Sequence, residues 1–151
     1  MTERELPKFL QIRNTIRNSL HDSREFTLNE CQIWFENKPQ DYWLILTGNT
    51  ILGYFRFEVD SKDRNFGIIG MDLDPVFHGL GYAKNLYQVF CSEMVPRYEV
   101  SNLRLRVLKS NSRAHSLYVS MGFAISEETQ VDYEMQISLE KLISNLSTQI
   151  G

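Results

Sequence analysis

The chain has 151 residues, of which 42% are hydrophobic, and its formal net charge at pH 7 is −3. A chain of this length buries about 70% of its unfolded surface when it folds as one domain, so we expect a substantial core. Positive and negative residues are mixed, which argues against nucleic acid or an anionic membrane as the main partner. The charged N-terminus is unlike a signal peptide, and no apolar run approaches the ~18 residues of a membrane span. We therefore expect one cytoplasmic domain over residues 1–151.

The two cysteines, Cys31 and Cys91, form neither a metal-ligand spacing nor a disulfide framework. That pattern is typical of a reducing compartment. Both cysteines are expected to be small buried apolar residues, and no bound metal is expected.

Two helices are predicted before any strand. Apolar residues recur at helical spacing over residues 6–20, with polar residues between them. Thr27 followed by Glu30 is a capping-box pattern that begins a second helix, which Pro39 would end.

The next part of the chain is rich in β-forming residues. The runs YWLILT and TILGYFRFEV are separated by Gly48 and Asn49, a two-residue hairpin signal with glycine first. A third run, FGIIGMDL, follows a polar turn. These runs predict an antiparallel meander.

Helices and strands alternate in the second half. A helix is predicted from Gly81 to just before Pro96, and the run NLRLRVL then alternates as a strand with one buried face. A short helix ends at Gly122, a further short strand is weighed at 123–126, and VDYEMQISL is the last strand. The polar tail from about residue 140 is expected to be a short helix or frayed. The order ααβββαβαβ predicts a mixed α/β domain in which the helix from Gly81 crosses over between two strands.

Gly79 and Gly81 lie immediately ahead of that crossover helix. A helix N-terminus presents unpaired N–H groups and partial positive charge, and glycines there let a diphosphate approach the backbone closely. A turn that merely needs positive φ is the alternative explanation.

Two longer patterns favour the first explanation. The run Leu-Asp-Pro-Val-Phe-His-Gly-Leu-Gly-Tyr-Ala, from Leu73, resembles the acyl-CoA loop of the GNAT N-acetyltransferase superfamily, which is written Arg/Gln-x-x-Gly-x-Gly/Ala. A second GNAT block, Asn-x-x-Ala-x-x-Leu-Tyr-x-x-x-Gly-Phe, is matched by Asn111, Ala114, Leu117, Tyr118, Gly122 and Phe123. The chain is thus similar to GNAT enzymes from Leu73 to Phe123 in specific motifs.

This resemblance implies a mixed, mostly antiparallel sheet with splayed central strands and flanking helices, and acetyl-CoA as co-substrate. Met71 and Leu73 would hydrogen-bond the pantetheine arm through their backbones, as an added strand does, and Asn111 would contact the same arm. The coenzyme pyrophosphate would be held by the loop residues His78, Gly79, Leu80, Gly81, Tyr82 and Ala83.

Tyr118 looks like the general acid of the family. A phenol within hydrogen-bond reach can protonate the coenzyme A thiolate as it leaves. Spacing alone would make Tyr118 a packing residue on the apolar stripe of its helix; the surrounding motif favours the catalytic role.

Two positions depart from the family pattern. His78 stands where Arg or Gln is usual, so it is either a single hydrogen-bond donor to phosphate or a tolerated solvent-facing substitution. No carboxylate matches the family's glutamate base, which leaves a water relay, Glu58, Tyr54 or, less favoured, Asp72 to remove the ammonium proton.

The positions of several arginines indicate which charge the acceptor amine carries elsewhere in its structure. Arg106 beside an acceptor pocket would repel a cationic peptide terminus and attract a carboxylate or phosphate, and Arg56 adds to this. A solvated sheet face, with Arg106 paired to acids such as Glu134, is the alternative. By resemblance the N-terminal region lines the acceptor side, which makes Arg24, Phe26 and Trp34 candidates as well.

We therefore expect direct acetyl transfer to a small anion-bearing amine, such as an amino-sugar nucleotide or an amino acid, with Tyr54, Arg24, Arg56 and Arg106 on the acceptor side. Acetylation of a protein N-terminus or lysine stays open, as does a non-catalytic acyl-CoA sensor. The expected state is a monomer or a homodimer.

Overall fold

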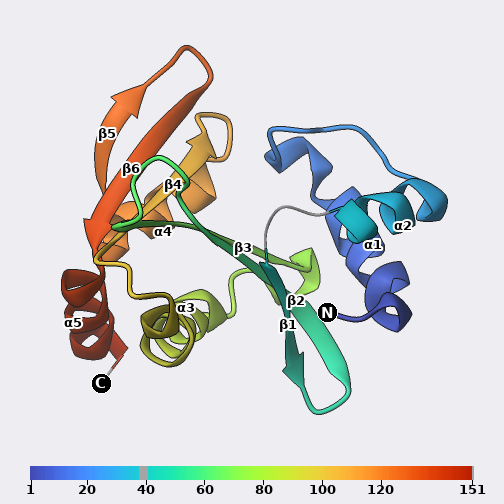
Figure 1. Ribbon diagram of the computed structural model, residues 1–151, viewed down its shortest axis with the longest axis horizontal. Coiled ribbons are helices and arrows are strands. Elements are labelled where there is room, and N and C mark those ends of the chain that lie inside the picture. The colour runs from blue at the N-terminus through green and yellow to red at the C-terminus, as the bar shows by residue number, and fades with distance from the viewer. Residues whose placement is uncertain (38–40, 151) are drawn as a thin grey trace. The chain divides into compact units, whose positions relative to one another are not determined.

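The computed structural model describes residues 1–37 and 41–150 (Figure 1). The chain forms two compact units. The first unit comprises Met1–Glu58 and Gly70–His78, and the second comprises Val59–Ile69 and Gly79–Gly151. The helix end predicted at Pro39 lies outside the described residues, and a single domain over residues 1–151 stays a prediction.

Helices and strands follow the predicted order. The α-helices of the described residues are α1 (Leu6–Thr15), α2 (Leu28–Asn37), α3 (Tyr82–Glu93), α4 (Ser112–Met121) and α5 (Leu139–Ile150). The strands are β1 (Asp41–Thr47), β2 (Thr50–Val59), β3 (Phe66–Leu73), β4 (Asn102–Leu108), β5 (Ala124–Glu128) and β6 (Asp132–Ser138). The further strand weighed near residue 123 is therefore present as β5, and the tail forms helix α5. No described helix has the length and apolarity that crossing a membrane requires.

The strands form one sheet in the order β1-β2-β3-β4-β6-β5. β1 and β2, β4 and β6, and β5 and β6 are antiparallel pairs, whereas β3 and β4 are parallel and are connected through α3. The parallel pairs run from Phe66 with Asn102 to Ile68 with Arg104, at the start of both strands. Pairing at one end is what splayed central strands require. The predicted α/β class is confirmed.

The first helix is shorter than predicted. The periodicity extends over residues 6–20, but α1 ends at Thr15, and Arg17–Ser19 forms a separate 3₁₀ turn. Ile16 has φ −97° and ψ 6°, outside the α-helical region. The side chain of Arg13 donates to the backbone carbonyls of Asp22 and Arg24, so the following loop folds back on α1 instead of extending it.

An aromatic cluster holds the first unit together. Phe9 of α1 stacks on Trp34 of α2, with ring centroids 5.1 Å apart and an interplanar angle of 3°. Phe9 also packs against Tyr42 of β1 and Tyr54 of β2, at 5.7 and 4.6 Å. The apolar faces of both helices are thus buried on the β1–β2 hairpin, whose turn has Gly48 at φ 59°, as predicted.

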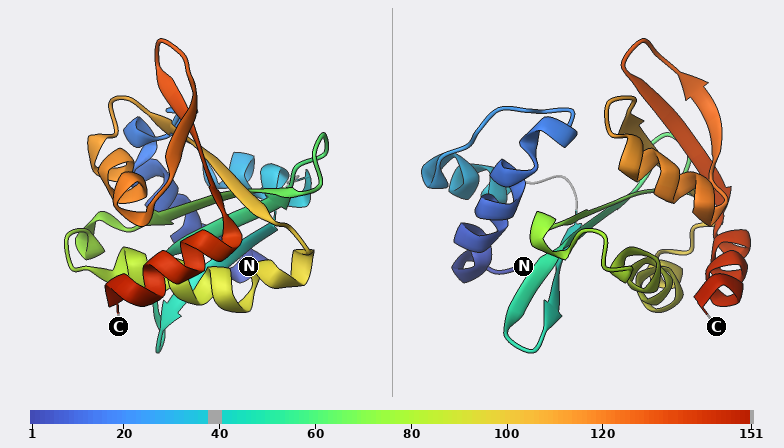
Figure 2. Two further views of the ribbon diagram at one scale, coloured as in Figure 1. Left: turned by 90° about the vertical axis from the view of Figure 1, so that its left-hand side faces the viewer. Right: turned by 180° about the vertical axis from the view of Figure 1, so that it is seen from behind.

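The second unit has an apolar helical layer on its strands. β4 buries Leu103, Leu105 and Val107, which confirms the predicted alternation. α5 lies beside α3, as the views of Figure 2 show, and the fully buried Leu142 and Leu146 belong to its inner face.

Candidate functional site

The loop ahead of α3 has the backbone that its glycines permit. Gly79 and Gly81 have φ of 76° and 79°, a left-handed conformation that L-residues rarely adopt. A Cβ built on either glycine would meet no atom within 4 Å, so conformation rather than crowding requires glycine here. Gly81 is the N-cap of α3 and has no side chain with which to accept a hydrogen bond from the first turn. The start of this helix therefore offers backbone N–H donors to an anion.

The loop is anchored to the end of β3 on its other side. The Asp74 side chain accepts a hydrogen bond from the Val76 amide at 3.2 Å and caps the 3₁₀ turn Pro75–Phe77. His78 Nε2 lies 3.0 Å from the Leu73 carbonyl oxygen. A carbonyl can only accept, so Nε2 carries the proton in this contact. The His78 ring is thus half-buried and contacts the end of the strand.

Helix α4 is capped at both ends. The Asn111 side-chain oxygen accepts from the Ala114 amide at 3.3 Å and caps the N-terminus. At the other end Gly122 has φ 103°, and Asn145 of α5 donates to the Met121 carbonyl at 3.0 Å. These contacts fix the helix that carries Tyr118.

Tyr118 is buried, with 8% of its surface exposed. Its hydroxyl oxygen accepts a hydrogen bond from the Tyr87 hydroxyl of α3 at 3.3 Å. The Tyr118 ring makes edge contacts with Tyr87 and Phe123, with centroids 6.2 and 5.7 Å away. The motif tyrosine is therefore held by contacts with Tyr87 of α3 and with Phe123, which follows α4.

The predicted acceptor arginines all have carboxylate partners. Arg106 contacts Glu127 at 2.7 Å, Asp132 at 3.3 Å and Glu134 at 3.4 Å. Hydrogen bonds to Glu127 and Asp132 raise the pKa of Arg106 against the opposing effect of burial, which is the largest single influence on it. Of the two roles weighed for Arg106, this geometry is that of a charge-paired sheet face.

Arg24 is paired in a different setting. It forms a two-pronged contact with Asp22, at 2.9 and 2.7 Å, and its side chain is 73% exposed. The Arg24 hydrogen bonds lower the pKa of the Asp22 carboxyl. An ion pair this exposed contributes little to stability.

Arg56 lies in a more enclosed cluster of the first unit. Its Nε is 3.5 Å from Asp72 Oδ2, and its guanidinium covers Gly70, where a Cβ would come within 2.7 Å of it. Tyr54 also hydrogen-bonds Asp72, and burial together with that carboxylate raises the pKa of Tyr54 well above its usual value. Burial likewise raises the pKa of Tyr42, with Arg56 opposing it. One cation, one carboxylate and two phenols thus meet here.

The sequence matches the acetyltransferase (GNAT) family over residues 6–123. The chain belongs to the GNAT family. It is an acetyl-CoA-dependent N-acyltransferase, as that membership implies. The left-handed glycines ahead of an uncapped helix fit the pyrophosphate of acetyl-CoA, because they supply N–H donors without side chains in the way. Among residues 1–37 and 41–150, no cluster of His, Cys, Asp or Glu could hold a metal ion.

Solved structures of other GNAT-fold proteins resemble the chain over nearly its whole length. YncA of Salmonella typhimurium, with its cofactor acetyl-CoA, is 15% identical, with a TM-score of 0.74 over 92% of this chain and 91% of that one. A ribosomal-protein-alanine N-acetyltransferase from Brucella melitensis is 18% identical, with a TM-score of 0.74 over 91% and 96%. The spermidine/spermine N-acetyltransferase of Vibrio cholerae is 13% identical, with a TM-score of 0.77 over 95% and 94%. No curated protein matches the chain by sequence. At sequence identities this low, the structural similarity shows that these proteins share the fold with the chain and shows nothing about their substrates in common.

The predicted GNAT site residues divide between the units. The first unit contains Met71, Leu73, His78, Arg24, Tyr54 and Arg56. The second unit contains Gly79, Leu80, Gly81, Tyr82, Ala83, Asn111, Tyr118 and Arg106. Within the first unit the structure brings Tyr54 and Arg56 together around Asp72, and Arg24 lies apart from them in the loop after α1. The roles of these residues stay predictions.

Two residues that were not predicted to have a role shape the first unit of this GNAT enzyme. Arg13 is 7% exposed, donates to two loop carbonyls and lies 4.1 Å from the Phe26 ring centroid. Asn14 pairs with the Phe26 backbone through both amide atoms, at 2.9 and 3.0 Å. Burial lowers the pKa of Arg13, with Asp22 opposing it. Consecutive polar residues in an amphipathic helix carried no signal of this anchoring role.

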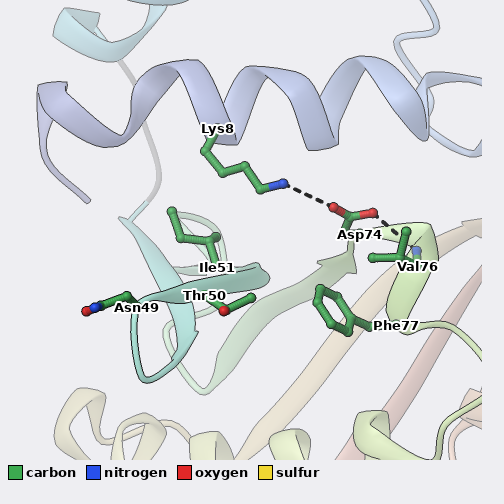
Figure 3. A pocket seen from close by; sticks show the side chains of 7 residues that line it. All are labelled: Lys8, Asn49, Thr50, Ile51, Asp74, Val76 and Phe77. Carbon is green, nitrogen blue, oxygen red and sulfur yellow. Dashed lines mark hydrogen bonds and ion pairs between the residues drawn. The ribbon is translucent and has the colours of Figure 1, made fainter.

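A hollow of about 290 Å³ lies elsewhere in the first unit (Figure 3). Its lining includes Ile51, Val76 and Phe77, and the Lys8 ammonium crosses it to Asp74 at 3.2 Å. Because Asp74 also caps the turn Pro75–Phe77, this ion pair connects α1 to the segment that leads into the glycine loop.

Proposed function

We propose that the chain transfers the acetyl group of acetyl-CoA directly to the primary amine of a small acceptor that also carries an anion. The observation that carries this proposal is the cluster of Arg56, Asp72 and Tyr54. Arg56 and Asp72 place opposite charges 3.5 Å apart, with 37% and 13% of their side chains exposed. An acceptor with an ammonium and an anionic group can pair with both.

Among the acceptors considered, an amino acid fits this cluster best. Its carboxylate and ammonium are separated by one carbon, which matches a neighbouring cation and carboxylate more closely than the distant phosphates of an amino-sugar nucleotide do. A polyamine carries no anion for Arg56 to bind. The cluster therefore favours an α-amino acid as acceptor.

The coenzyme side of the proposal rests on backbone groups. The amides from His78 to Ala83 bind the pyrophosphate, and the backbones of Met71 and Leu73 bind the pantetheine arm. The Leu73 carbonyl already accepts from His78, so the pantetheine amide must share or replace that contact. His78 would thus influence the pantetheine arm rather than a phosphate.

Tyr118 is the proposed general acid. The amine nitrogen attacks the thioester carbonyl, the carbon–sulfur bond breaks, and sulfur leaves with the bonding electrons. The Tyr118 O–H proton moves to that sulfur, and the phenolate regains a proton from solvent. The substrate ammonium loses one proton to water before it attacks, and the nitrogen loses a second as the amide forms. Because solvent returns one proton to Tyr118, one proton is released for each ammonium acetylated.

Tyr54 does not fit the role of base. Its pKa is raised well above the usual value, chiefly by burial, so the phenolate that a base requires is depleted at neutral pH. Tyr54 instead donates to Asp72 and orients that carboxylate. A water relay next to Asp72 is the proton route that this arrangement supports.

The test is thiol release from acetyl-CoA with a panel of α-amino acids, amino-sugar nucleotides, polyamines and peptide N-termini. We expect turnover on an α-amino acid, and we expect Arg56→Met to raise its KM about 30-fold, as loss of a charge-assisted contact of about 2 kcal/mol would. Tyr118→Phe should lower kcat about 100-fold while the Kd for coenzyme A is unchanged. Arg64→Met, the same substitution at an exposed turn residue, is the control. Turnover confined to polyamines or peptides would contradict the proposal that the acceptor is an α-amino acid. Coenzyme binding without any turnover would favour a non-catalytic acyl-CoA sensor.

A further inference from the structure

We infer that Tyr87 is a positioning residue that orients Tyr118 and stabilises its phenolate during acetyl transfer. This inference rests on the proposed role of Tyr118 as the acid. It begins from one contact, the hydrogen bond from the Tyr87 hydroxyl to the Tyr118 hydroxyl at 3.3 Å.

Hydrogen-bond counting shows what this contact does. A phenol has one hydrogen to donate and can also accept. Tyr118 accepts from Tyr87, so this contact does not consume the hydrogen of the Tyr118 hydroxyl. Tyr87 therefore occupies an acceptor position of the Tyr118 oxygen and helps to fix where that oxygen lies.

The same contact becomes stronger as the proton moves. When the Tyr118 O–H bond breaks, its electron pair stays on oxygen as a phenolate and the proton forms the S–H bond of coenzyme A. Tyr87 keeps its own proton and donates to that phenolate. A hydrogen bond to a charged acceptor is about twice as strong as one between neutral groups, so Tyr87 assists most when Tyr118 has lost its proton.

Burial makes the contact more effective. Tyr87 has 0% of its surface exposed and Tyr118 has 8%, so water competes little for either hydroxyl. The strand β4 buries only apolar side chains, Leu103, Leu105 and Val107, and α5 contributes the neutral Asn145 to the end of α4.

The other titratable groups nearby in the fold do not replace Tyr87. Cys91 lies one turn further along α3, and burial raises its pKa to about 12, so it stays neutral. His115 of α4 stacks on Tyr133 of β6, with centroids 4.9 Å apart. The Tyr87 hydroxyl, by contrast, is in hydrogen-bond contact with Tyr118.

Helix α3 connects this role to the coenzyme loop. It begins at Tyr82, directly after Gly81, and Tyr87 lies about 7.5 Å along its axis. A loop that binds the pyrophosphate thus belongs to the same rigid element as the hydroxyl that orients the acid.

The experiment compares Tyr87→Phe, Tyr118→Phe and the double variant, with the amine that turns over fastest. We expect Tyr87→Phe to lower kcat about 10-fold without changing the Kd for coenzyme A, and to move the alkaline limb of the kcat profile about 1 pH unit higher, because the phenolate loses its donor. In the Tyr118→Phe background, Tyr87→Phe should change kcat by about twofold or less. Tyr133→Phe, a half-buried phenol of the same unit, should leave both readouts unchanged.

Each outcome separates the two hypotheses. A kcat loss of equal size in both backgrounds, or an alkaline limb that does not move, would overturn the role of Tyr87 alone. If Tyr118→Phe kept the kcat of the wild type, the proposed role of Tyr118 as the general acid and the inference about Tyr87 would both be contradicted. A readout that needs no acceptor is the ionisation of Tyr118, followed by NMR of protein labelled with carbon-13 at the phenol carbon of tyrosine. A midpoint that rises in Tyr87→Phe supports the inference, and an unchanged midpoint contradicts it.

Discussion

The two compact units place their functional groups by different physical means. In the second unit, the loop proposed to bind the coenzyme depends on local backbone geometry: Gly79 and Gly81 adopt positive φ, and the helix that follows offers its amides. In the first unit, Arg56, Asp72 and Tyr54 come together across strands, and each one's position depends on residues distant in the chain. Local geometry leaves a short motif in the sequence, whereas a cluster formed across strands does not.

The largest expected effect tests the long-range geometry of the first unit. A Cβ at Gly53 would lie 2.2 Å from the Asp72 carbonyl oxygen and 2.8 Å from the Leu73 Cα. Both are backbone atoms, so the strands must move apart to accept Gly53→Ala. We expect this substitution to lower the free energy of unfolding by about 3 kcal/mol in urea denaturation.

Gly48→Ala is the matched control for Gly53→Ala. Gly48 has φ 59° but no atom within 4 Å of a built Cβ, so only backbone strain of about 1 kcal/mol is expected. Equal losses in the two variants would show that close approach of β2 and β3 is not what requires glycine at residue 53.

A smaller effect is expected for the local geometry of the second unit. Gly81→Ala disfavours φ 79° without creating a clash, so the loop should relax and its amides should turn away from the coenzyme. We expect the Kd for coenzyme A, measured by calorimetry, to rise about 10-fold, which corresponds to about 1.4 kcal/mol. Gly48→Ala carries similar strain outside the loop and should leave that Kd unchanged. A normal Kd in Gly81→Ala would mean that the loop binds through other groups.

The same contrast explains what the sequence could predict. The order of helices and strands followed from periodicity and turn residues, and the GNAT motifs identified the family because they encode a local loop and a local helix. The end of α1 was wrong because Arg13 binds carbonyls of residues 22 and 24, a contact that periodicity does not contain. The three carboxylates around Arg106 come from β5 and β6, so the alternation of β4 could not distinguish an acceptor site from a charge-paired face. The contact between Tyr87 and Tyr118 joins helices that are far apart in the chain, so helical periodicity could not predict it.

The smallest expected effect concerns how each unit buries a thiol. Cys91 in the second unit is fully buried, and burial raises its pKa from 9.0 to about 12. Cys31 in the first unit also has a raised pKa, but Arg13 opposes the effect of burial there. In the unfolded chain either thiol ionises near its usual value, so above pH 9 the unfolded state loses a proton that folded Cys91 retains. Unfolding is therefore favoured as pH rises, and the stability that neutral Cys91 contributes below pH 9 is lost between pH 9 and 12.

We expect the free energy of unfolding of the wild type to fall about 1 kcal/mol more than that of Cys91→Ala between pH 9 and pH 10 in urea denaturation. Cys31→Ala, the matched control, should follow the wild type more closely, because the nearby guanidinium makes its thiolate less costly. If both alanine variants flattened the pH dependence equally, the charge of Arg13 would have no bearing on the Cys31 thiol, and the contrast between a polar and an apolar burial site would not hold for the cysteines.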